Sequence, residues 1–376
     1  MSPRLRRSDP SRPGIARRRR GRGFSYVDAT GAPVEDPATL ERISALAIPP
    51  AWNDVWISPH ENGHLQAIGT DDAGRRQYLY HPGWAELRSR EKYARMMEFA
   101  QALPQLREQV DDLLDPEAVD ADVPTRDRVL ALAVRLLDRA WFRIGNEHYA
   151  NEHGSHGLLT LRRTHVTLEP PDSLTFDFPA KHGVRMFRRV SDPVSFAVVQ
   201  VLHRRRGGPE ALLAWRPAPR APWSALSADD VNAFLRERTG IACSAKDFRT
   251  WHGTVLCAMA LASQEAEARA AGREPRASQR ALEREVAAAV RETSEFLGNT
   301  PAVCRSSYVD PRVIDRYRDG RTIQPGIERL LRLDDLEDID LQRVVEAATL
   351  RLLEDRTPQT IARAAERVIE EQLDAA

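Results

Sequence analysis

Five residues spread along the chain have the side chains that phosphoryl transfer to a hydroxyl group requires. They are two arginines, a lysine, an asparagine and a tyrosine: Arg143, Lys181, Arg249, Asn299 and Tyr308. Guanidinium groups bind phosphate oxygens through paired donors, an ammonium group can release a proton, and a phenol can act as nucleophile. Each residue alone is weak evidence, because arginines in helices are commonly solvated and tyrosines commonly pack in cores. The five residues together support the hypothesis of phosphoryl transfer.

Lysine is rare in this chain. Of 55 basic residues only Lys92, Lys181 and Lys246 are lysines. A guanidinium cannot release a proton at accessible pH, whereas an ammonium group can. Base composition of the genome can produce such a bias, but each remaining lysine still needs an explanation, and Lys181 is the candidate proton donor.

A histidine-rich segment offers an alternative chemistry. His148, His153 and His156 lie five and three positions apart, across Gly154. Zinc hydrolases place two histidines one helical turn apart with a glutamate beside the first, and this spacing does not match. We therefore predict no metal site, and polar residues at a helix end are the simpler interpretation. A metal-dependent nuclease remains the alternative, and it would lose activity with a chelator.

Length and composition limit the class of protein. A chain of 376 residues predicts two domains. No apolar run approaches the ~18 residues of a membrane span. The three cysteines, Cys243, Cys257 and Cys304, are odd in number and widely spaced, which argues against a disulfide framework and fits a reducing cytoplasm.

The charges are unevenly distributed although the formal net charge is zero. Residues 1–23 hold nine arginines and one aspartate, whereas residues 326–376 hold seven basic and thirteen acidic residues. We interpret residues 1–23 as a basic flexible arm that binds DNA phosphates, with a solubilising tail as the alternative.

The pattern of elements predicts an α+β protein. Residues 24–112 form a small β-rich domain with a helix after Trp84, and the acidic stretch 111–124 marks the boundary. Residues 113–376 form a larger, mainly helical domain. Alternation over 158–190 predicts a three-stranded antiparallel sheet inserted in this domain, with Lys181 in its second turn. The expected helices cover 126–142, 194–206, 227–239, 245–271, 276–296 and 340–372, with a separate final helix starting at Thr357-Pro358.

The order and local contexts of the five residues resemble the small type IB DNA topoisomerases of bacteria and poxviruses, across about residues 24–320. The matching segments are Arg143-Ile-Gly-Asn-Glu, the turn lysine, Lys246-Asp-Phe-Arg249-Thr and Leu297-Gly-Asn-Thr-Pro. Tyr308 follows Asn299 by nine positions, the interval used in that family. The fold expected is the one shared by tyrosine recombinases and these topoisomerases.

The resemblance implies an isomerase that relaxes supercoiled DNA without ATP. Arg143 and Arg249 would neutralise the phosphate, Tyr308 would form a 3′-phosphotyrosyl link, and Lys181 would give a proton to the leaving 5′ oxygen. Double-stranded DNA is the implied partner, with no nucleotide cofactor or metal, for a monomer in the cytoplasm on the nucleoid. No phosphate-binding Gly-rich loop of the nucleotide-binding type is present in the sequence.

The resemblance also implies DNA contacts outside the reacting centre. Residues 69–82 are similar to the signature of the domain that closes over the duplex. There, Gln77 and Tyr78 would reach base edges in the major groove, with Arg76 and Tyr80 beside them. Lys246 would be a further phosphate contact, with a structural salt bridge as its alternative.

One position departs from the better-known pattern. Poxvirus and eukaryotic members have histidine where this chain has Asn299, although asparagine occurs in some bacterial relatives. An amide can donate a hydrogen bond to a phosphate oxygen but cannot carry charge, so orientation and oxyanion stabilisation are the roles left to it. Neighbouring His252 cannot simply fill the vacancy.

Two rival functions remain open. A tyrosine recombinase uses a similar residue set but generally has a helical N-terminal domain and requires paired sites. A non-catalytic DNA-binding clamp would form no covalent adduct, and Tyr308→Phe would leave its DNA binding unchanged.

Overall fold

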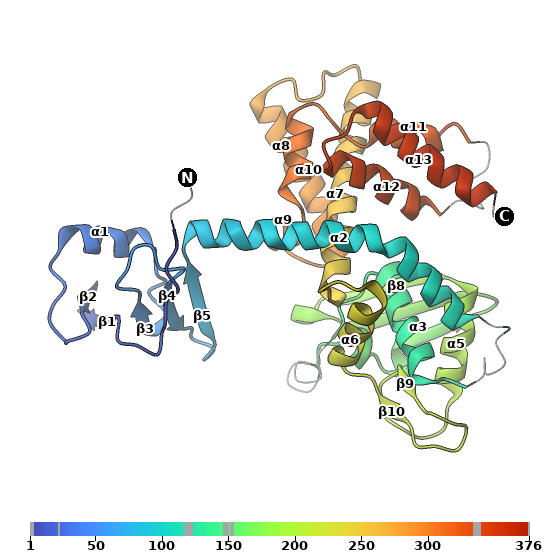
Figure 1. Cartoon of the computed structure of the whole chain (residues 1–376), viewed down its shortest axis with the longest axis horizontal. Coiled ribbons are helices and arrows are strands. Elements are labelled where there is room, and N and C mark those ends of the chain that lie inside the picture. Colours follow the sequence, from blue (N-terminus) through green and yellow to red (C-terminus); the bar gives the residue numbers. More distant parts are fainter. Residues whose placement is uncertain are drawn as a thin grey trace. The chain divides into compact units, whose positions relative to one another are not determined.

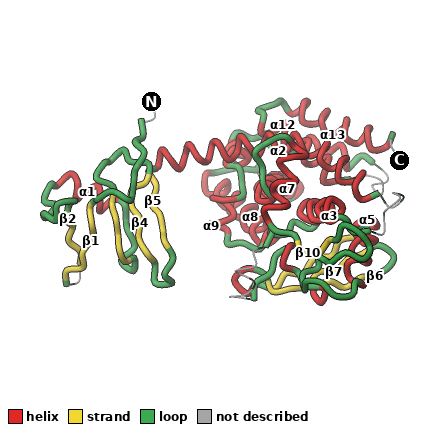
Figure 2. Tube along the Cα trace, turned by 60° about the horizontal axis from the view of Figure 1, so that its bottom comes forward, coloured by secondary structure: helices red, strands yellow, loops and turns green. Residues whose placement is uncertain are grey.

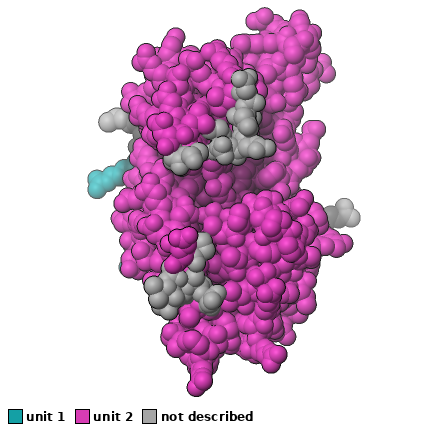
Figure 3. All heavy atoms as spheres, turned by 90° about the vertical axis from the view of Figure 1, so that its right-hand side faces the viewer, with its two compact units in different colours: residues 1–94 teal, residues 95–376 magenta. Residues whose placement is uncertain are grey.

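The computed structural model describes residues 4–21, 23–115, 117, 123–145, 150, 154–333 and 340–374. The chain divides into two compact units, residues 1–94 and 95–376 (Figures 1 and 3). Helix α2 (Pro82–Leu114) runs from the first unit into the second. Within the described ranges, no helix combines the length and apolar character that crossing a bilayer requires.

The first unit is built on a five-stranded antiparallel sheet in the order β2-β1-β3-β4-β5 (Figure 2). Ile15, Ile57, Ala67 and Ile43 form its core. Asp36 caps the one short helix of this sheet region by accepting from the Thr39 amide, and Pro37 begins it. The elements are β1 (Ile15–Arg20), β2 (Gly23–Val27), α1 (Pro37–Ala45), β3 (Asn53–Ile57), β4 (Leu65–Thr70) and β5 (Arg76–Tyr80).

The second unit is mainly helical, as expected, and holds the predicted three-stranded antiparallel sheet, β6-β7-β8, and a two-stranded ribbon, β9-β10. Its strands are β6 (Val166–Glu169), β7 (Ser173–Pro179), β8 (Arg185–Ser191), β9 (Ala214–Trp215) and β10 (Ser224–Ala225). Short 3-10 turns cover Leu158–Thr160, Arg163–His165 and Lys181–Gly183.

The helices of the second unit follow local sequence signals closely. Ser227 and Asp230 form the predicted capping box, and Thr300 caps the helix that Pro301 begins. Figure 1 shows α11, α12 and α13 packed together. The helices are α3 (Arg126–Arg139), α5 (Pro193–Arg204), α6 (Ala228–Thr239), α7 (Ala245–Ala270), α8 (Gln279–Leu297), α9 (Pro301–Ser307), α10 (Pro311–Arg318), α11 (Gln324–Leu330), α12 (Leu341–Leu353) and α13 (Pro358–Leu373).

The structure differs from the sequence-based expectation in the N-terminal region. Residues 15–20, expected in a flexible arm, form strand β1, because Ile15 packs in the core and the backbone pairs with β2 and β3. Residues 37–45 form a helix where only short strands were expected. The two compact units divide at 94/95, within α2, whereas the predicted domain limit lies near residue 112 and stays a prediction.

The carboxyl end of α2 is closed by a buried arginine. The Arg128 guanidinium on α3 donates to the carbonyl oxygens of Leu113, Leu114 and Asp115. These are carbonyls that have no partner inside their own helix. The acidic stretch that indicated a linker is therefore joined to α3 by hydrogen bonds.

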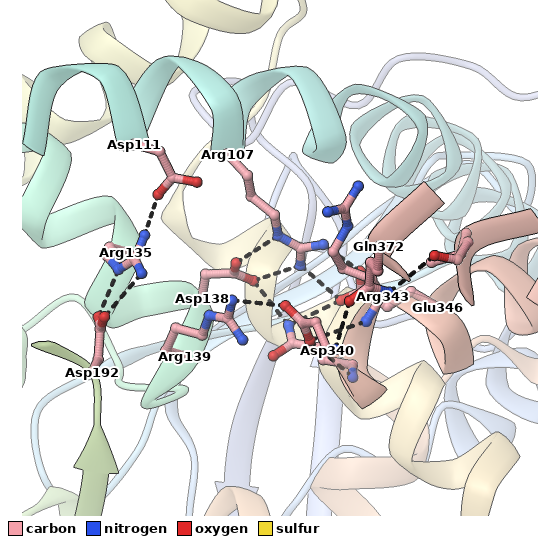
Figure 4. Close-up of polar contacts among 12 residues, drawn as sticks. Arg107, Asp111, Arg135, Asp138, Arg139, Asp192, Asp340, Arg343, Glu346 and Gln372 are labelled. Carbon is pink, nitrogen blue, oxygen red and sulfur yellow. Dashed lines mark hydrogen bonds and ion pairs between the residues drawn. The ribbon is translucent and has the colours of Figure 1, made fainter. Parts of the chain in front are cut away.

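A buried cluster of charges joins three helices of the second unit (Figure 4). Arg107 on α2 donates to both carboxylate oxygens of Asp138 on α3, at 2.8 and 3.0 Å, and to both of Glu346 on α12, at 2.7 and 2.9 Å. Burial alone would lower the pKa of Arg107, but the two carboxylates hold it well above its ordinary value. The cluster thus joins α2, α3 and α12 through one buried guanidinium and the carboxylates of Asp138 and Glu346.

We predict that Arg107→Met destabilises the second unit by about 3–5 kcal/mol, because it leaves two buried carboxylates without their cation. Chemical denaturation followed by circular dichroism measures the change. Arg88→Met is the matched control on the same helix, since the Arg88–Glu91 pair is exposed and contributes ~1 kcal/mol or less. Equal, small effects of the two substitutions would contradict this assignment.

Candidate active site

Four of the five predicted residues come together in the second unit. Arg143 lies in the segment after α3, Arg249 on α7, Asn299 just after α8, and Tyr308 at the end of α9. The Arg143 Nη2 atom donates to the Asn299 Oδ1 atom at 2.7 Å and to the Gly298 carbonyl at 2.6 Å. The Arg249 guanidinium carbon lies 5.1 Å from the centre of the Tyr308 ring.

The two guanidinium groups are close enough to influence each other electrostatically. Arg249 is only 4% exposed, and burial, followed by the charge of Arg143, lowers its pKa to about 10. Burial also lowers the pKa of Arg143, and the neighbouring Tyr308 opposes that shift. At about 10, the pKa of Arg249 is still well above neutrality, and arginine side chains keep their charge in proteins. The site therefore concentrates two positive charges beside one phenol.

The partners recorded for these guanidiniums in the described part of the chain are neutral. Arg249 donates to the carbonyl oxygens of Trp141, at 3.1 Å, and Leu297, at 2.8 Å. Its Nε atom is buried without a hydrogen-bond partner. A buried cation held by carbonyl dipoles retains its attraction for an anion, because no carboxylate among these contacts neutralises it.

The side-chain amide of Asn299 uses its oxygen but not its nitrogen in hydrogen bonds. Its oxygen accepts from Arg143, and its Nδ2 atom is buried with no hydrogen-bond partner. A buried donor without a partner costs free energy, so a ligand that accepts from it gains by comparison. The side chain is oriented by Arg143 with its donor available.

Close contact between two glycines fixes the backbone that carries Arg143. The amide groups of Leu158 and Leu159 donate to the carbonyl oxygens of Arg143 and Ile144, both at 2.8 Å. A Cβ atom on Gly157 would lie 2.5 Å from the Gly145 Cα atom, and Gly145 itself has φ +89°. Only glycines permit this approach, which explains the glycine in the Arg-Ile-Gly segment.

Helix α7 positions the backbone of Tyr308 as well as Arg249. The Thr254 hydroxyl accepts from the Asp310 amide at 3.1 Å, and its proton is shared between the Thr250 carbonyl oxygen, at 2.8 Å, and the Tyr308 carbonyl oxygen, at 3.3 Å. One residue earlier, a Cβ atom on Gly253 would lie 2.8 Å from the Tyr308 carbonyl oxygen. The absence of a side chain at position 253 lets the tyrosine segment approach α7.

Lys181 lies where the sequence predicted, in the turn between β7 and β8, and it is exposed. Its hairpin contacts the segment that carries Asn299, because Arg188 on β8 donates to the Phe296 carbonyl and its guanidinium carbon lies 4.0 Å from the centre of the Phe296 ring. Among the described residues, no hydrogen bond or ion pair joins Lys181 to the other four. The hairpin that carries the lysine thus contacts the end of α8, but its turn is not fixed to the site.

The histidines of the candidate metal segment are only partly described. His148 and His153 lie outside the described residues. The His156 Nδ1 atom bonds to the Thr160 carbonyl oxygen at 2.7 Å, and its ring lies 4.6 Å from that of His165. Burial, with His156 nearby, lowers the pKa of His165. These contacts are those of histidines that fix a turn.

A different group of potential ligands, Asp138, His252 and Glu346, brings its ligand atoms within 4.8 Å of one another. Arg107 already donates to both carboxylates, so the charge that a cation would supply is present. This group belongs to the buried charge cluster and not to a metal centre.

The residues predicted to contact DNA lie in two places. Arg76, Tyr78 and Tyr80 alternate along strand β5, where both tyrosines are about half exposed and their rings stack, with centres 6.2 Å apart. Lys246 is exposed in the first turn of α7, three residues before Arg249. An exposed aromatic pair beside a cation suits contact with nucleic acid.

Gln77 lies on the opposite face of β5 from Tyr78, because side chains alternate along a strand. Its amide donates to the Asp71 carboxylate at 2.9 Å. The backbone hydrogen bond from Arg75 is the largest of the contacts that lower the pKa of Asp71 to about 2. The Gln77 amide is therefore bonded to a carboxylate that is ionised at neutral pH. The geometry does not present Gln77 and Tyr78 to one ligand surface.

Strand β1 adds arginines that the sequence had assigned to a mobile arm. Ala16 of β1 pairs with Trp56 of β3. Trp56 pairs in turn with Ile68 of β4, and Ile68 pairs with Tyr78 of β5, so these four side chains lie on one face of the sheet. Arg18 and Arg20, two and four positions after Ala16, therefore share the face of Tyr78. This arginine and tyrosine face is the candidate nucleic-acid surface of the first unit.

A buried pair of guanidiniums beside a phenol suits an enzyme that acts on a phosphodiester, and comparison with known proteins identifies the class. Residues 82–324 match the family model of the eukaryotic DNA topoisomerase I catalytic core, and residues 23–71 match that of the bacterial DNA topoisomerase IB N-terminal domain. The chain therefore belongs to the type IB DNA topoisomerase family, and it is an isomerase that acts on DNA.

Two curated relatives illustrate the range of similarity. DNA topoisomerase 1B of Acanthamoeba polyphaga mimivirus is 27% identical over 320 residues, which cover 81% of this chain and 88% of the viral protein. DNA topoisomerase 1 of Schizosaccharomyces pombe is 31% identical over 135 residues, 36% of this chain but only 15% of the yeast protein. The similarity thus extends over nearly a whole small topoisomerase and over a short part of a large one.

We predict that Gly253→Ala slows DNA cleavage by roughly 100-fold, because the added methyl group displaces Tyr308 from its place beside Arg249. Single-turnover cleavage of a labelled duplex measures the rate, and a binding assay should give an unchanged affinity. Gly23→Ala serves as control, since its Cβ atom would meet only the Arg20 carbonyl oxygen, at 4.0 Å. Normal cleavage by Gly253→Ala would show that the close approach has no catalytic importance.

Proposed function

We propose that this topoisomerase relaxes supercoiled DNA without ATP, by transient cleavage of one strand through a 3′-phosphotyrosyl intermediate formed by Tyr308. The observation that supports this most is the pair of partly or fully buried guanidiniums, Arg143 and Arg249, which have neutral hydrogen-bond partners and lie beside a phenol. Such a pocket is complementary to a phosphodiester and to the additional negative charge of its transition state.

In the first step, the Tyr308 phenol oxygen attacks the phosphorus atom and the bond from phosphorus to the 5′ oxygen breaks. The phenol gives its proton to solvent water, and the two guanidiniums favour the phenolate by their charge. They also bind the nonbridging oxygens through their forked donors. The product is a phosphotyrosine at the 3′ end of the broken strand.

Asn299 contributes a neutral donor to this step. Its Nδ2 atom is buried and unpartnered, and Arg143 holds the amide in one orientation through the oxygen. A hydrogen bond from Nδ2 to a nonbridging oxygen would satisfy this donor. The asparagine orients the phosphate and stabilises its developing charge without titrating, in the position where other members have histidine.

The leaving 5′ oxygen needs a proton, and Lys181 is our candidate donor. It lies in a hairpin turn that contacts the Asn299 segment, and it is exposed in the protein without DNA. We propose that bound DNA draws the ammonium group toward the scissile phosphate. The phosphotyrosine retains the energy of the broken bond, so the 5′ hydroxyl can reseal the strand without ATP, and the enzyme needs no nucleotide or metal.

DNA binding is proposed to use both units of one polypeptide, acting as a monomer on the nucleoid. Arg76, Tyr78 and Tyr80 would contact the duplex from the first unit and Lys246 a phosphate from the second. Arg18 and Arg20 extend the first of these surfaces. Gln77 would need to leave Asp71 to reach a base.

We predict that a duplex with a short 3′ leaving strand traps the wild-type protein as a covalent adduct, whereas Tyr308→Phe binds the same duplex but forms none. Denaturing electrophoresis of labelled DNA separates adduct from free strand. EDTA should leave the adduct yield unchanged, because the guanidiniums supply the charge. An adduct with Tyr308→Phe, or loss of cleavage in EDTA, would argue against the proposal, and a requirement for two paired sites would favour recombination.

The arginines of β1 provide a separate prediction. Arg18→Ala with Arg20→Ala should weaken duplex binding and reduce the slope of log affinity against log salt by about two, since each phosphate contact contributes ~0.9. Binding measured by fluorescence anisotropy at several salt concentrations gives this slope. Arg19→Ala, on the opposite face of the same strand, should change neither quantity appreciably, and equal effects would place the DNA elsewhere.

A further inference from the structure

A chain of contacts lies behind the guanidinium of Arg249. His252 follows Arg249 by three positions on α7 and is 1% exposed. Its ring stacks on that of Trp141, with centres 4.7 Å apart and 20° between the planes. The carbonyl oxygen of Trp141 accepts the hydrogen bond from Arg249 Nη1. One aromatic residue thus touches both the histidine and the catalytic arginine.

The backbone of Trp141 needs such support. Its φ angle is +61°, in the left-handed region that side chains other than glycine rarely adopt. A conformation of this kind persists only where the surrounding contacts fix it. The Trp141 ring contacts Phe296 as well as His252, with the Trp141 and Phe296 ring centres 4.5 Å apart. These ring contacts hold the carbonyl where Arg249 can reach it.

Asp138 fixes the orientation of His252. The His252 Nε2 atom and the Asp138 Oδ1 atom lie 3.2 Å apart, and both side chains are buried. Burial alone would raise the pKa of Asp138, but the charge of Arg107 and the hydrogen bond from His252 hold it well below its usual value. The ionised carboxylate can only accept, so Nε2 is the donor and the imidazole plane is set by this bond.

Asp138 is in turn held from a distant part of the chain. Arg107 binds it through two hydrogen bonds, and the Gln342 amide on α12 donates to Oδ1 at 3.1 Å. Helix α12 lies beyond residue 324, where the match to the catalytic-core family model ends. Figure 4 shows Arg107 between Asp138 and Glu346. The support for Arg249 therefore includes a C-terminal segment outside the matched core.

We propose that His252, oriented by Asp138, is a positioning residue that fixes the Trp141 carbonyl and through it the guanidinium of Arg249. The inference rests on the catalytic role proposed above for Arg249. His252 itself touches no reacting atom. Its removal should leave the phosphate pocket formed but its second guanidinium poorly placed.

The first arm of the test compares two substitutions by single-turnover cleavage of a labelled duplex. His252→Leu removes both the ring stack and the donor, and we expect cleavage to fall by roughly 10-fold to 100-fold. His252→Gln keeps an N–H donor for Asp138 and should recover part of this loss. Duplex affinity and the thermal midpoint, measured in parallel, should remain close to wild type for both variants.

A second arm separates positioning of Arg249 from a general structural effect. In a methylphosphonate duplex, a methyl group replaces one nonbridging oxygen and the negative charge at phosphorus disappears. The defect of Arg249→Ala should shrink on this substrate, because little charge remains to be neutralised. If His252 acts through Arg249, the defect of His252→Leu shrinks in parallel. The defect of Lys181→Ala, which concerns the leaving oxygen, should not shrink.

The outcomes distinguish a failure of the proposed function from a failure of the positioning role of His252. Wild-type cleavage by Arg249→Ala would overturn the proposed function. A defect in Arg249→Ala together with normal cleavage by His252→Leu, or with a His252→Leu defect equal on both substrates, would overturn the positioning role alone. Should His252→Leu fail to fold, His252→Phe retains the ring beside Trp141 and loses only the donor. It should show a smaller defect with the same relief on methylphosphonate, and a defect of equal size on both substrates would count against the inference.

Discussion

The proposed mechanism depends on one electrostatic constraint: two guanidiniums remain charged and close together, and in the described part of the chain no carboxylate forms a hydrogen bond with either. Arg249 is buried, Arg143 is largely buried, and burial lowers the pKa of both. Neutral carbonyl and amide oxygens accept their hydrogen bonds and so fix both side chains without a countercharge. A phosphodiester is complementary to such an arrangement, because its paired oxygens match forked donors. The cationic site is therefore preorganised in the fold before DNA binds.

The rest of the second unit is organised to maintain that constraint. Gly145 and Gly157 allow the backbone approach that holds Arg143, and Gly253 allows Tyr308 to lie against α7. Two buried carboxylates of this unit, Asp138 and Glu346, are engaged by Arg107. Cysteines are no rival nucleophile here, because burial raises the pKa of Cys304 to about 11.

The sequence named candidate site residues but not the contacts that surround them. The positions of Arg143, Lys181, Arg249, Asn299 and Tyr308 followed from side-chain chemistry and the resemblance, and caps such as Ser227 followed from local rules. The carbonyl partners of Arg249 could not be predicted, because every residue has a carbonyl and only the folded backbone selects Trp141 and Leu297.

The largest difference concerns the N-terminal arginines. Their charge indicated an arm, but backbone pairing with β2 and β3 decides the structure of residues 15–20, and a run of arginines contains no signal for that pairing. Helix α1 was missed although Asp36-Pro37 is a recognisable start, because the surrounding turn residues favoured strands. The roles of the five site residues and the limits of the domains remain predictions.

A crystal structure of Tyr308→Phe bound to a nicked duplex tests the central claim most directly. We expect both guanidiniums within hydrogen-bond distance of the nonbridging oxygens of one phosphate. The Asn299 Nδ2 atom should donate to a nonbridging oxygen of the same phosphate, and the Lys181 ammonium should lie beside the 5′ oxygen. A scissile phosphate bound away from Arg143 and Arg249, or a Lys181 side chain that stays in solvent in the complex, would contradict the mechanism proposed for this enzyme.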